Sequence, residues 1–126
     1  MRSLTFWILT ATLLNLHSAS DARGQECTAG PKCTAAGQKS EDYNATMRQR
    51  LSETSGTANA ATMNYCVMMV GAEVSRVCAD EQRELGKASC AKLADLQAEA
   101  FKKNAKASEQ IVMQTSQGPW QRICGW

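Results

Sequence analysis

We expect the fold to be organised around the stretch from Met63 to Cys90, which reads MNYCVMMVGAEVSRVCADEQRELGKASC. Its apolar residues recur three and four positions apart, the spacing that places side chains on one face of an α-helix. They are Met63, Cys66, Val67, Val70, Val74, Val77 and Cys78. Three of the six cysteines lie on this stretch or at its end. The sequence therefore predicts a central helix to which the other segments are attached by disulfides.

Two more helices are predicted around it. Residues 38–54 form the first helix, residues 58–83 the central one and residues 88–115 the third. Ser40 followed by Glu41 and Asp42 gives the first helix an N-cap and an acidic first turn. Residues 21–37, which contain Gly30-Pro31, are expected to form an irregular arm. Turns are expected at Ser55–Thr57, near Gly86 and at Gly118-Pro119.

Each flanking helix has an expected apolar face. On the first helix the face comprises Tyr43, Met47 and Leu51. On the third it comprises Cys90, Leu93, Ala94, Leu96, Ala100, Phe101, Ala107, Ile111 and Val112. Gly71 lies inside the central helix, where glycine costs about 1 kcal/mol relative to alanine, and we expect it to mark a close helix crossing.

The fold class is therefore all-α, a small three-helix bundle of up-down-up topology held by disulfides. Its six cysteines are Cys27, Cys33, Cys66, Cys78, Cys90 and Cys124. Residues equidistant from the turn near residue 56 face each other, which favours Cys33–Cys78. The third helix brings the segment with Cys124 back to the level of Cys66, which favours Cys66–Cys124. Cys27 and Cys90 then remain, both at the other end of the bundle. The rival connectivity pairs Cys78 with Cys90 across the turn and Cys27 with Cys33 locally. Six cysteines allow 15 pairings, so spacing alone leaves both open.

The N-terminal residues 1–20 have the three-part pattern of a secretory signal peptide. A positive charge at Arg2 precedes the apolar run Leu4–Leu16, which is shorter than the roughly 20 residues of a membrane span. Small residues then favour cleavage after Ser20, with a site near Gly24 as the alternative. We expect residues 21–126 to form one disulfide-rich domain, secreted to the extracellular space and without stable membrane insertion. An even cysteine count agrees with that compartment.

Several functions lack the residues that they require. The single histidine, His17, belongs to the predicted signal peptide, which leaves no histidine for a Ser-His or Cys-His nucleophile pair. Metal-ligand spacings are missing, so neither a metal nor a cofactor is expected. A formal net charge of +2 gives no reason to expect nucleic-acid binding. The acidic cluster Asp80, Glu81 and Glu84 is interpreted as a solvated helix end, and we expect no enzyme.

Candidate binding residues gather near the C-terminus. Tryptophan is enriched among interface hot spots, and Trp120 and Trp126 flank Ile123 beside Cys124. A basic patch is also predicted, formed by Lys102, Lys103 and Lys106. The triplet Asn44-Ala45-Thr46 is an N-glycosylation sequon, so Asn44 is a candidate acceptor.

The cysteine spacing matches neither the insect odorant-binding pattern nor the saposin pattern. In composition and signal the chain is broadly similar to helical, disulfide-stapled secreted toxins and secretory proteins, with no motif that assigns a residue role. The function predicted is non-catalytic binding of an extracellular protein or receptor, as a toxin-like effector, signal or pheromone-like ligand. The alternative is an extracellular carrier of a small apolar ligand, in a cavity lined by Met63, Val67, Val70, Phe101 and Ile111.

Overall fold

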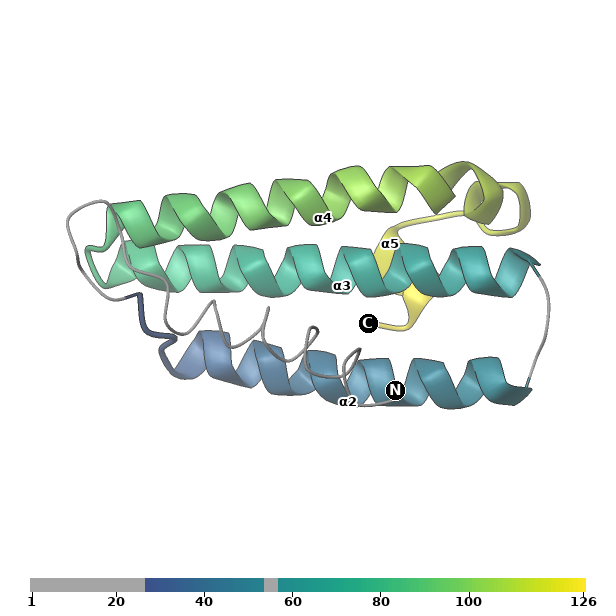
Figure 1. Ribbon diagram of the computed structural model, residues 1–126, viewed down its shortest axis with the longest axis horizontal. Coiled ribbons are helices and arrows are strands. Elements are labelled where there is room, and N and C mark those ends of the chain that lie inside the picture. The colour runs from purple at the N-terminus through teal and green to yellow at the C-terminus, as the bar shows by residue number, and fades with distance from the viewer. Residues whose placement is uncertain (1–26, 54–56) are drawn as a thin grey trace, which may run out of the picture.

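The computed structural model describes residues 27–53 and 57–126. The predicted signal peptide, its cleavage sites and part of the predicted turn at Ser55–Thr57 lie outside the described residues. Three long helices follow one another: α2 (Pro31–Glu53), α3 (Thr57–Glu84) and α4 (Ala88–Thr115). A short helix, α5 (Trp120–Cys124), ends the chain. The predicted all-α, up-down-up fold is confirmed (Figure 1).

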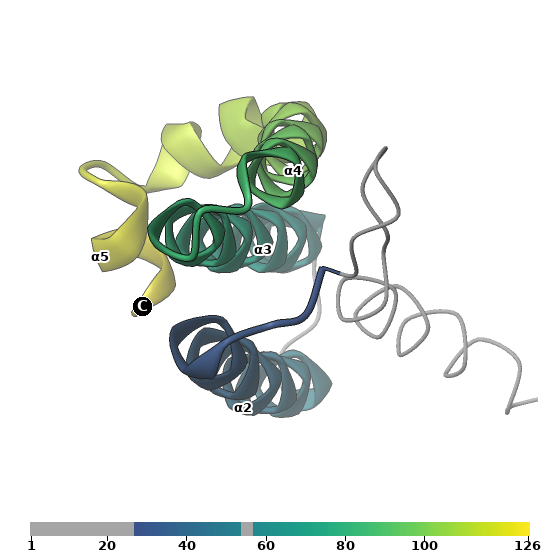
Figure 2. The ribbon, with the colours of Figure 1, turned by 90° about the vertical axis from the view of Figure 1, so that its left-hand side faces the viewer.

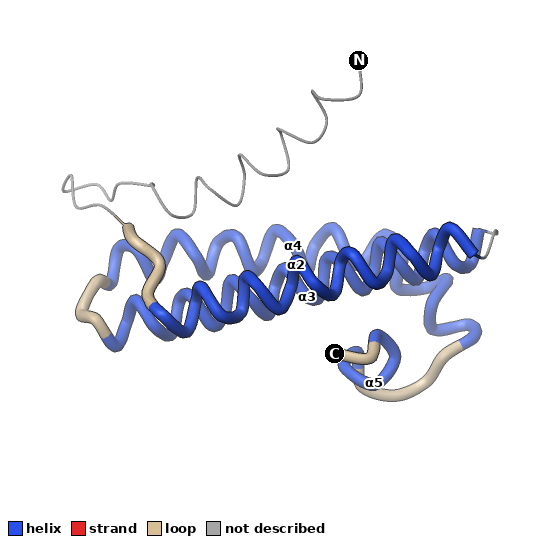
Figure 3. The backbone as a smooth tube through the Cα atoms, turned by 90° about the horizontal axis from the view of Figure 1, so that it is seen from below, coloured by secondary structure: helices blue, strands red, loops and turns tan. Residues whose placement is uncertain are grey.

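The three long helices form a layer with α3 in the middle. Seen end-on, α2 and α4 lie on opposite sides of α3 (Figure 2). Helix α3 contacts α4 along its length (Figure 1), α2 less extensively, and α5 through a smaller contact. Helix α5 lies on one side of the layer, where the chain turns back toward α3 and α2 (Figure 3). The expectation that α3 is the organising helix is therefore confirmed.

Helix α2 begins at Pro31, seven residues before the predicted start. The predicted irregular arm is thus wrong from Pro31 onward, and Ser40 is a buried residue inside the helix rather than its N-cap. Gly30-Pro31 is the actual start, because proline suits the first helical turn, where its missing N–H is not needed. The cap comes from another helix: both carboxylate oxygens of Glu81 on α3 accept backbone N–H bonds from Lys32 and Cys33 at 2.8 and 2.9 Å.

All three disulfides have the predicted connectivity. Cys27–Cys90, Cys33–Cys78 and Cys66–Cys124 have Cα–Cα distances of 5.6, 4.5 and 5.4 Å. The rival pairing is excluded, and no cysteine of the chain is free. The first bond attaches the segment before α2 to α4, and the second attaches α2 to α3. The third attaches α3 to the C-terminal tail, which comprises α5 and residues 125–126. Disulfides of this kind are typical of proteins that fold in an oxidising compartment.

Helix α4 packs against α3 through small side chains. Its buried residues are Cys90, Ala91, Ala94, Ala98, Ala105, Ser108 and Val112. Gly71 on α3 gives room for the ring of Phe101, since a Cβ at Gly71 would lie 2.8 Å from that ring. The predicted close crossing at Gly71 is confirmed.

The predicted apolar face of α4 is wrong in part. Cys90, Ala94 and Val112 are buried, but Leu93, Leu96 and Ile111 are exposed. Alanines allow α4 to approach α3 closely, and this packing turns the larger aliphatic side chains outward. In such a helix the large apolar residues therefore mark the exposed side and not the side that packs on α3.

The predicted turn glycine Gly86 is confirmed, and a second turn glycine, Gly125, was not predicted. Gly86, between α3 and α4, has a φ of 73°, and Gly125, after α5, has a φ of 68°. Both values are in the left-handed region that favours glycine. The helical turn of α5 itself was not predicted, since five residues carry too little periodicity to reveal it.

Candidate binding groove beside the C-terminal tail

A groove of about 300 Å³ runs between α2 and the C-terminal tail. It combines an apolar surface with charged side chains contributed by α2. Its lining residues are Lys39, Asp42, Tyr43, Thr46, Met47, Arg50, Cys124, Gly125 and Trp126. The α2 members recur three, four and seven positions apart, so they share one side of the helix. Among the predicted binding residues, Trp126 is the one that lines this groove.

The indole of Trp126 is held from two directions. The ring of Tyr43 meets it edge-on, with ring centroids 5.6 Å apart and an interplanar angle of 84°. The Lys39 ammonium lies 4.0 Å from the centroid of the Trp126 ring, a cation–π contact. These contacts fix the position of the last residue of the tail.

Tyr43 also ties the tail to α2 by a hydrogen bond. Its hydroxyl donates to the backbone carbonyl of Cys124 at 2.7 Å. Burial raises the pKa of Tyr43, and the nearby positive charge of Arg50 opposes this effect. The Cys66–Cys124 disulfide anchors the same tail to α3. The C-terminal tail, which forms one wall of the groove, is thus held by both α2 and α3. These contacts preorganise the groove.

The other predicted binding residues lie elsewhere. Trp120 and Ile123 are half-buried against the hydrophobic clusters of the bundle. The lysines Lys102, Lys103 and Lys106 are exposed on α4, and the Lys102 ammonium lies 3.6 Å from Glu99. The structure therefore divides the predicted residues between the groove, the core and α4. Their binding roles stay predictions.

Asn44 lies on the inner side of α2, next to Tyr43. It is half-buried, and its Oδ1 is buried without a hydrogen-bond partner. Thr46, the third residue of the sequon, donates to the backbone carbonyl of Asp42 at 3.1 Å. Glycosylation of Asn44 stays a prediction.

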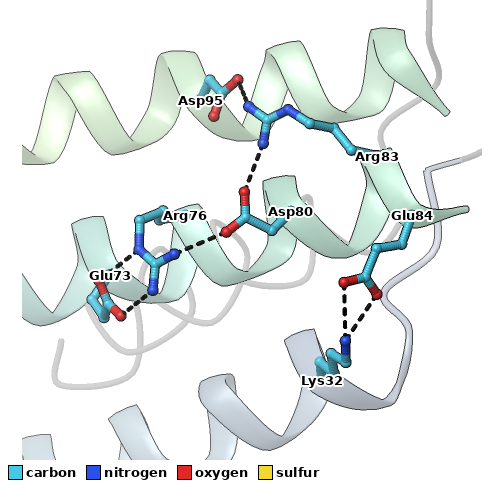
Figure 4. A network of polar contacts seen from close by, with 7 residues as sticks. All are labelled: Lys32, Glu73, Arg76, Asp80, Arg83, Glu84 and Asp95. Atoms are coloured by element: carbon cyan, nitrogen blue, oxygen red, sulfur yellow. Dashed lines mark hydrogen bonds and ion pairs between the residues drawn. The ribbon is translucent and has the colours of Figure 1, made fainter. Parts of the chain in front are cut away.

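The acidic cluster at the end of α3 separates into three environments, and Figure 4 shows those of Asp80 and Glu84. Asp80 accepts hydrogen bonds from Arg76 at 2.8 Å and Arg83 at 2.9 Å. Arg83 also binds Asp95 on α4, and Glu84 accepts two bonds from the Lys32 ammonium. Glu81 is 4% exposed, which corrects its interpretation as part of a solvated helix end. It is buried because it caps α2.

Hydrogen bonds to carboxylates hold these basic groups in their charged form. The bond to Glu73 is the main reason that the pKa of Arg76 is raised, and the bond to Asp95 has the same effect on the pKa of Arg83. The bond to Glu84 raises the pKa of Lys32. The cluster is thus a set of ion pairs joining α3 to α2 and α4.

The residues predicted to line a cavity for an apolar ligand lie in different surroundings. Val70 is fully buried in the cluster around Cys33 and Cys78, whereas Ile111 is exposed. Phe101 fills the space above Gly71. Within residues 27–53 and 57–126, no group of three side chains could hold a metal ion. No helix in that same part of the chain has the length and hydropathy to cross a membrane.

No protein-family model matches the sequence, and neither a curated protein nor a solved structure matches it.

Proposed function

We propose that this chain is a secreted, non-catalytic binding protein that recognises an extracellular protein through the groove between α2 and the tail. The observation that carries the proposal is the fixed position of Trp126, held by Tyr43, Lys39 and the disulfide-anchored tail. Tryptophan is enriched among the few interface residues that supply most of the binding free energy. A wall that is already ordered loses little conformational freedom when a partner binds.

The lining of the groove favours a particular kind of target side chain. Met47, Tyr43 and Trp126 offer apolar and aromatic surface, while Lys39 and Arg50 contribute positive charge and Asp42 a side-chain carboxylate. A side chain or peptide end with an apolar body and an acidic tip complements both. An acidic segment of an extracellular protein is the target that we expect.

Secretion and the absence of catalysis are parts of the same proposal. Three disulfides agree with an oxidising compartment, and the pattern of residues 1–20 agrees with export. The densest acidic cluster is engaged in ion pairs and in capping α2, which supports a structural role for its carboxylates.

A second candidate is a carrier of a small molecule, now placed in the groove instead of the bundle interior. A volume of about 300 Å³ equals the lower limit of typical ligand sites, roughly 300–1,000 Å³. The ligand would combine an apolar body with an acidic group, for the same reasons as the protein target.

The test compares retention of extracellular proteins on the immobilised, disulfide-intact chain and on its variants. We expect Trp126→Ala and Lys39→Glu to lose a protein that the natural chain retains. Replacing Lys102, Lys103 and Lys106 by alanine serves as the control, because these residues lie on α4. If both groove variants still retain the protein, the proposal is contradicted. If the variant without the three lysines loses the protein, the binding surface lies on α4 instead.

Native mass spectrometry of the protein purified from its own source tests the carrier. An acidic small molecule that accompanies the protein, and that Trp126→Ala releases, supports the carrier. If the purified protein carries no such molecule, the carrier function is excluded and the protein target is favoured.

A further inference from the structure

Helix α4 buries small side chains and exposes large ones. Leu96, Leu93 and Ile111 are 59%, 43% and 37% exposed, and Ala100 and Ala107 are exposed as well. Buried positions of the same helix are occupied mostly by alanine. A helix that needed only to pack on α3 would gain nothing from large apolar residues on its other side.

These five residues form one stripe. At about 100° per residue they fall within roughly 60° of one another around α4, on a side separate from the buried face. From Leu93 to Ile111 the stripe extends about 27 Å along the helix. Apolar residues at three- and four-residue spacing are the surface that a helix presents to another helix. Helix α4 uses a different face for α3, so the stripe is not covered by it.

We propose that this stripe is the interface of a homodimer, in which α4 packs antiparallel against α4 of a second copy. The proposal goes beyond the binding groove, which lies on the α2 side of the layer. Two properties of α4 point to a second copy as the occupant: the order of large and small residues, and the charges beside the stripe.

The order of side chains along the stripe is self-complementary. When the twofold axis passes near Lys102, Leu93 of one copy lies opposite Ile111 of the other. Leu96 then lies close to Ala107 of the second copy, so that a large side chain meets a small one. Ala100, near the axis, allows the two helices to approach closely.

The charges along one edge of the stripe favour the antiparallel direction. This edge carries Lys92, Glu99, Lys103 and Lys106, all exposed. In an antiparallel pair related by a twofold axis, the same edge of each helix meets itself. Glu99 then lies within about two residues, roughly 3 Å along the axis, of Lys103 and Lys106 of the second copy. A parallel pair would instead place this edge against the uncharged Gln97 and Asn104.

Sedimentation equilibrium of the secreted, disulfide-intact protein tests the interface. We expect a monomer–dimer equilibrium, and we expect Leu96→Asp to lower the association constant at least about tenfold, because it places two charges in an apolar contact. Met113→Asp is the matched control, since Met113 is 38% exposed and lies about 130° around α4 from the centre of the stripe. Circular dichroism should show the same helix content in both variants, because both positions are exposed.

Charge reversal and crosslinking test the direction of the pair. Glu99→Lys should weaken association, and adding Lys106→Glu should restore it. A short amine-reactive crosslinker, applied to mixed light and heavy isotope-labelled protein, should join Lys103 to Lys103 between copies. A link between Lys92 and Lys92 would show a parallel pair and overturn the proposal.

A monomer at every concentration would also overturn it, as would association that Leu96→Asp leaves unchanged. Leu96→Asp should not alter binding at the groove. A failure of the dimer is thereby distinguished from a failure of the proposed function.

Discussion

Helices α2 and α4 flank α3 on opposite sides, and they are held to it in different ways. Helix α4 packs along the whole of α3 through alanines, and no disulfide joins these two helices directly. Helix α2 makes less extensive contact and is held by the Cys33–Cys78 bond and by the Glu81 cap. Covalent and charged contacts thus stabilise the side where side-chain packing is sparse.

The composition of the buried face of α2 explains why side-chain packing is sparse on this side of α3. Between Cys33 and Met47 this face contains Ala36, Gly37, Ser40 and Asn44, and a single large side chain, Tyr43. Small and polar side chains bury little apolar area, and burial contributes only about 25 cal/mol per Å². The groove that we propose as the binding site lies on this same sparse side, where packing leaves space.

The largest effect is expected from removing the bond that attaches α2. Replacing Cys33 and Cys78 together by alanine should lower the free energy of unfolding by about 2–4 kcal/mol, because the unfolded chain is no longer constrained. Urea denaturation followed by circular dichroism measures the change. A loss below about 1 kcal/mol would mean that packing and the Glu81 cap suffice for α2.

A smaller effect is expected from overfilling the α3–α4 contact. Ala98→Leu should cost about 1–3 kcal/mol of unfolding free energy, because Ala98 is buried where the helices meet. Ala100→Leu is the control on the exposed side of the same helix, measured at a concentration at which the protein is monomeric. Equal stability of the two variants would show that the α3–α4 contact is loosely packed.

The cap of α2 should contribute less than the packing. Glu81→Ala leaves the Lys32 and Cys33 N–H groups without their acceptor, and we expect a loss of about 1–2 kcal/mol. Glu84→Ala removes an exposed ion pair to Lys32 and should cost at most about 1 kcal/mol. Thermal denaturation of the two variants provides the comparison. A larger loss from Glu84→Ala would contradict the role of Glu81.

The hydrogen bond from Tyr43 should have the smallest effect at neutral pH. Tyr43→Phe removes its donor to Cys124 and should cost about 1 kcal/mol. The pKa of Tyr43 is raised above 10.0, so the folded state holds the proton more tightly than the unfolded state. This contribution is complete below about pH 10 and is lost as the pH rises through the folded pKa.

Stability of the natural chain should therefore decline above about pH 10, and the decline should be shallower in Tyr43→Phe. Urea denaturation at a series of pH values measures both slopes. Identical slopes would mean that the Tyr43 hydroxyl titrates alike in the folded and unfolded states.

Much of the fold was predictable from the sequence, for identifiable reasons. The apolar spacing of Met63 to Cys78 predicted α3, and the up-down-up topology favoured the three observed disulfides over the rival pairing, which spacing alone left open. Gly86 and the residues after it set the start of α4. These features are local, or follow from topology alone.

The start of α2 and the rotation of α4 were not predictable in the same way. Helix α2 begins at Pro31 because Glu81, distant in the sequence, caps it. The buried face of α4 is made of alanines, which hydrophobic periodicity ranks below leucine and isoleucine. The groove depends on Lys39, Tyr43 and Arg50 meeting a tail more than 70 residues later. Their spacing on α2 was visible in the sequence, but the tail that covers them was not.

Hydrogen exchange of the Cys33→Ala/Cys78→Ala variant tests most directly whether α2 and α4 are held differently. If the disulfide compensates for sparse packing, the backbone amides of α2 should exchange much faster than in the natural chain. Amides of α3 and α4 should keep their protection, because alanine packing holds that pair. Equal loss of protection in all three helices would contradict the account, since it would show that the layer opens as one unit.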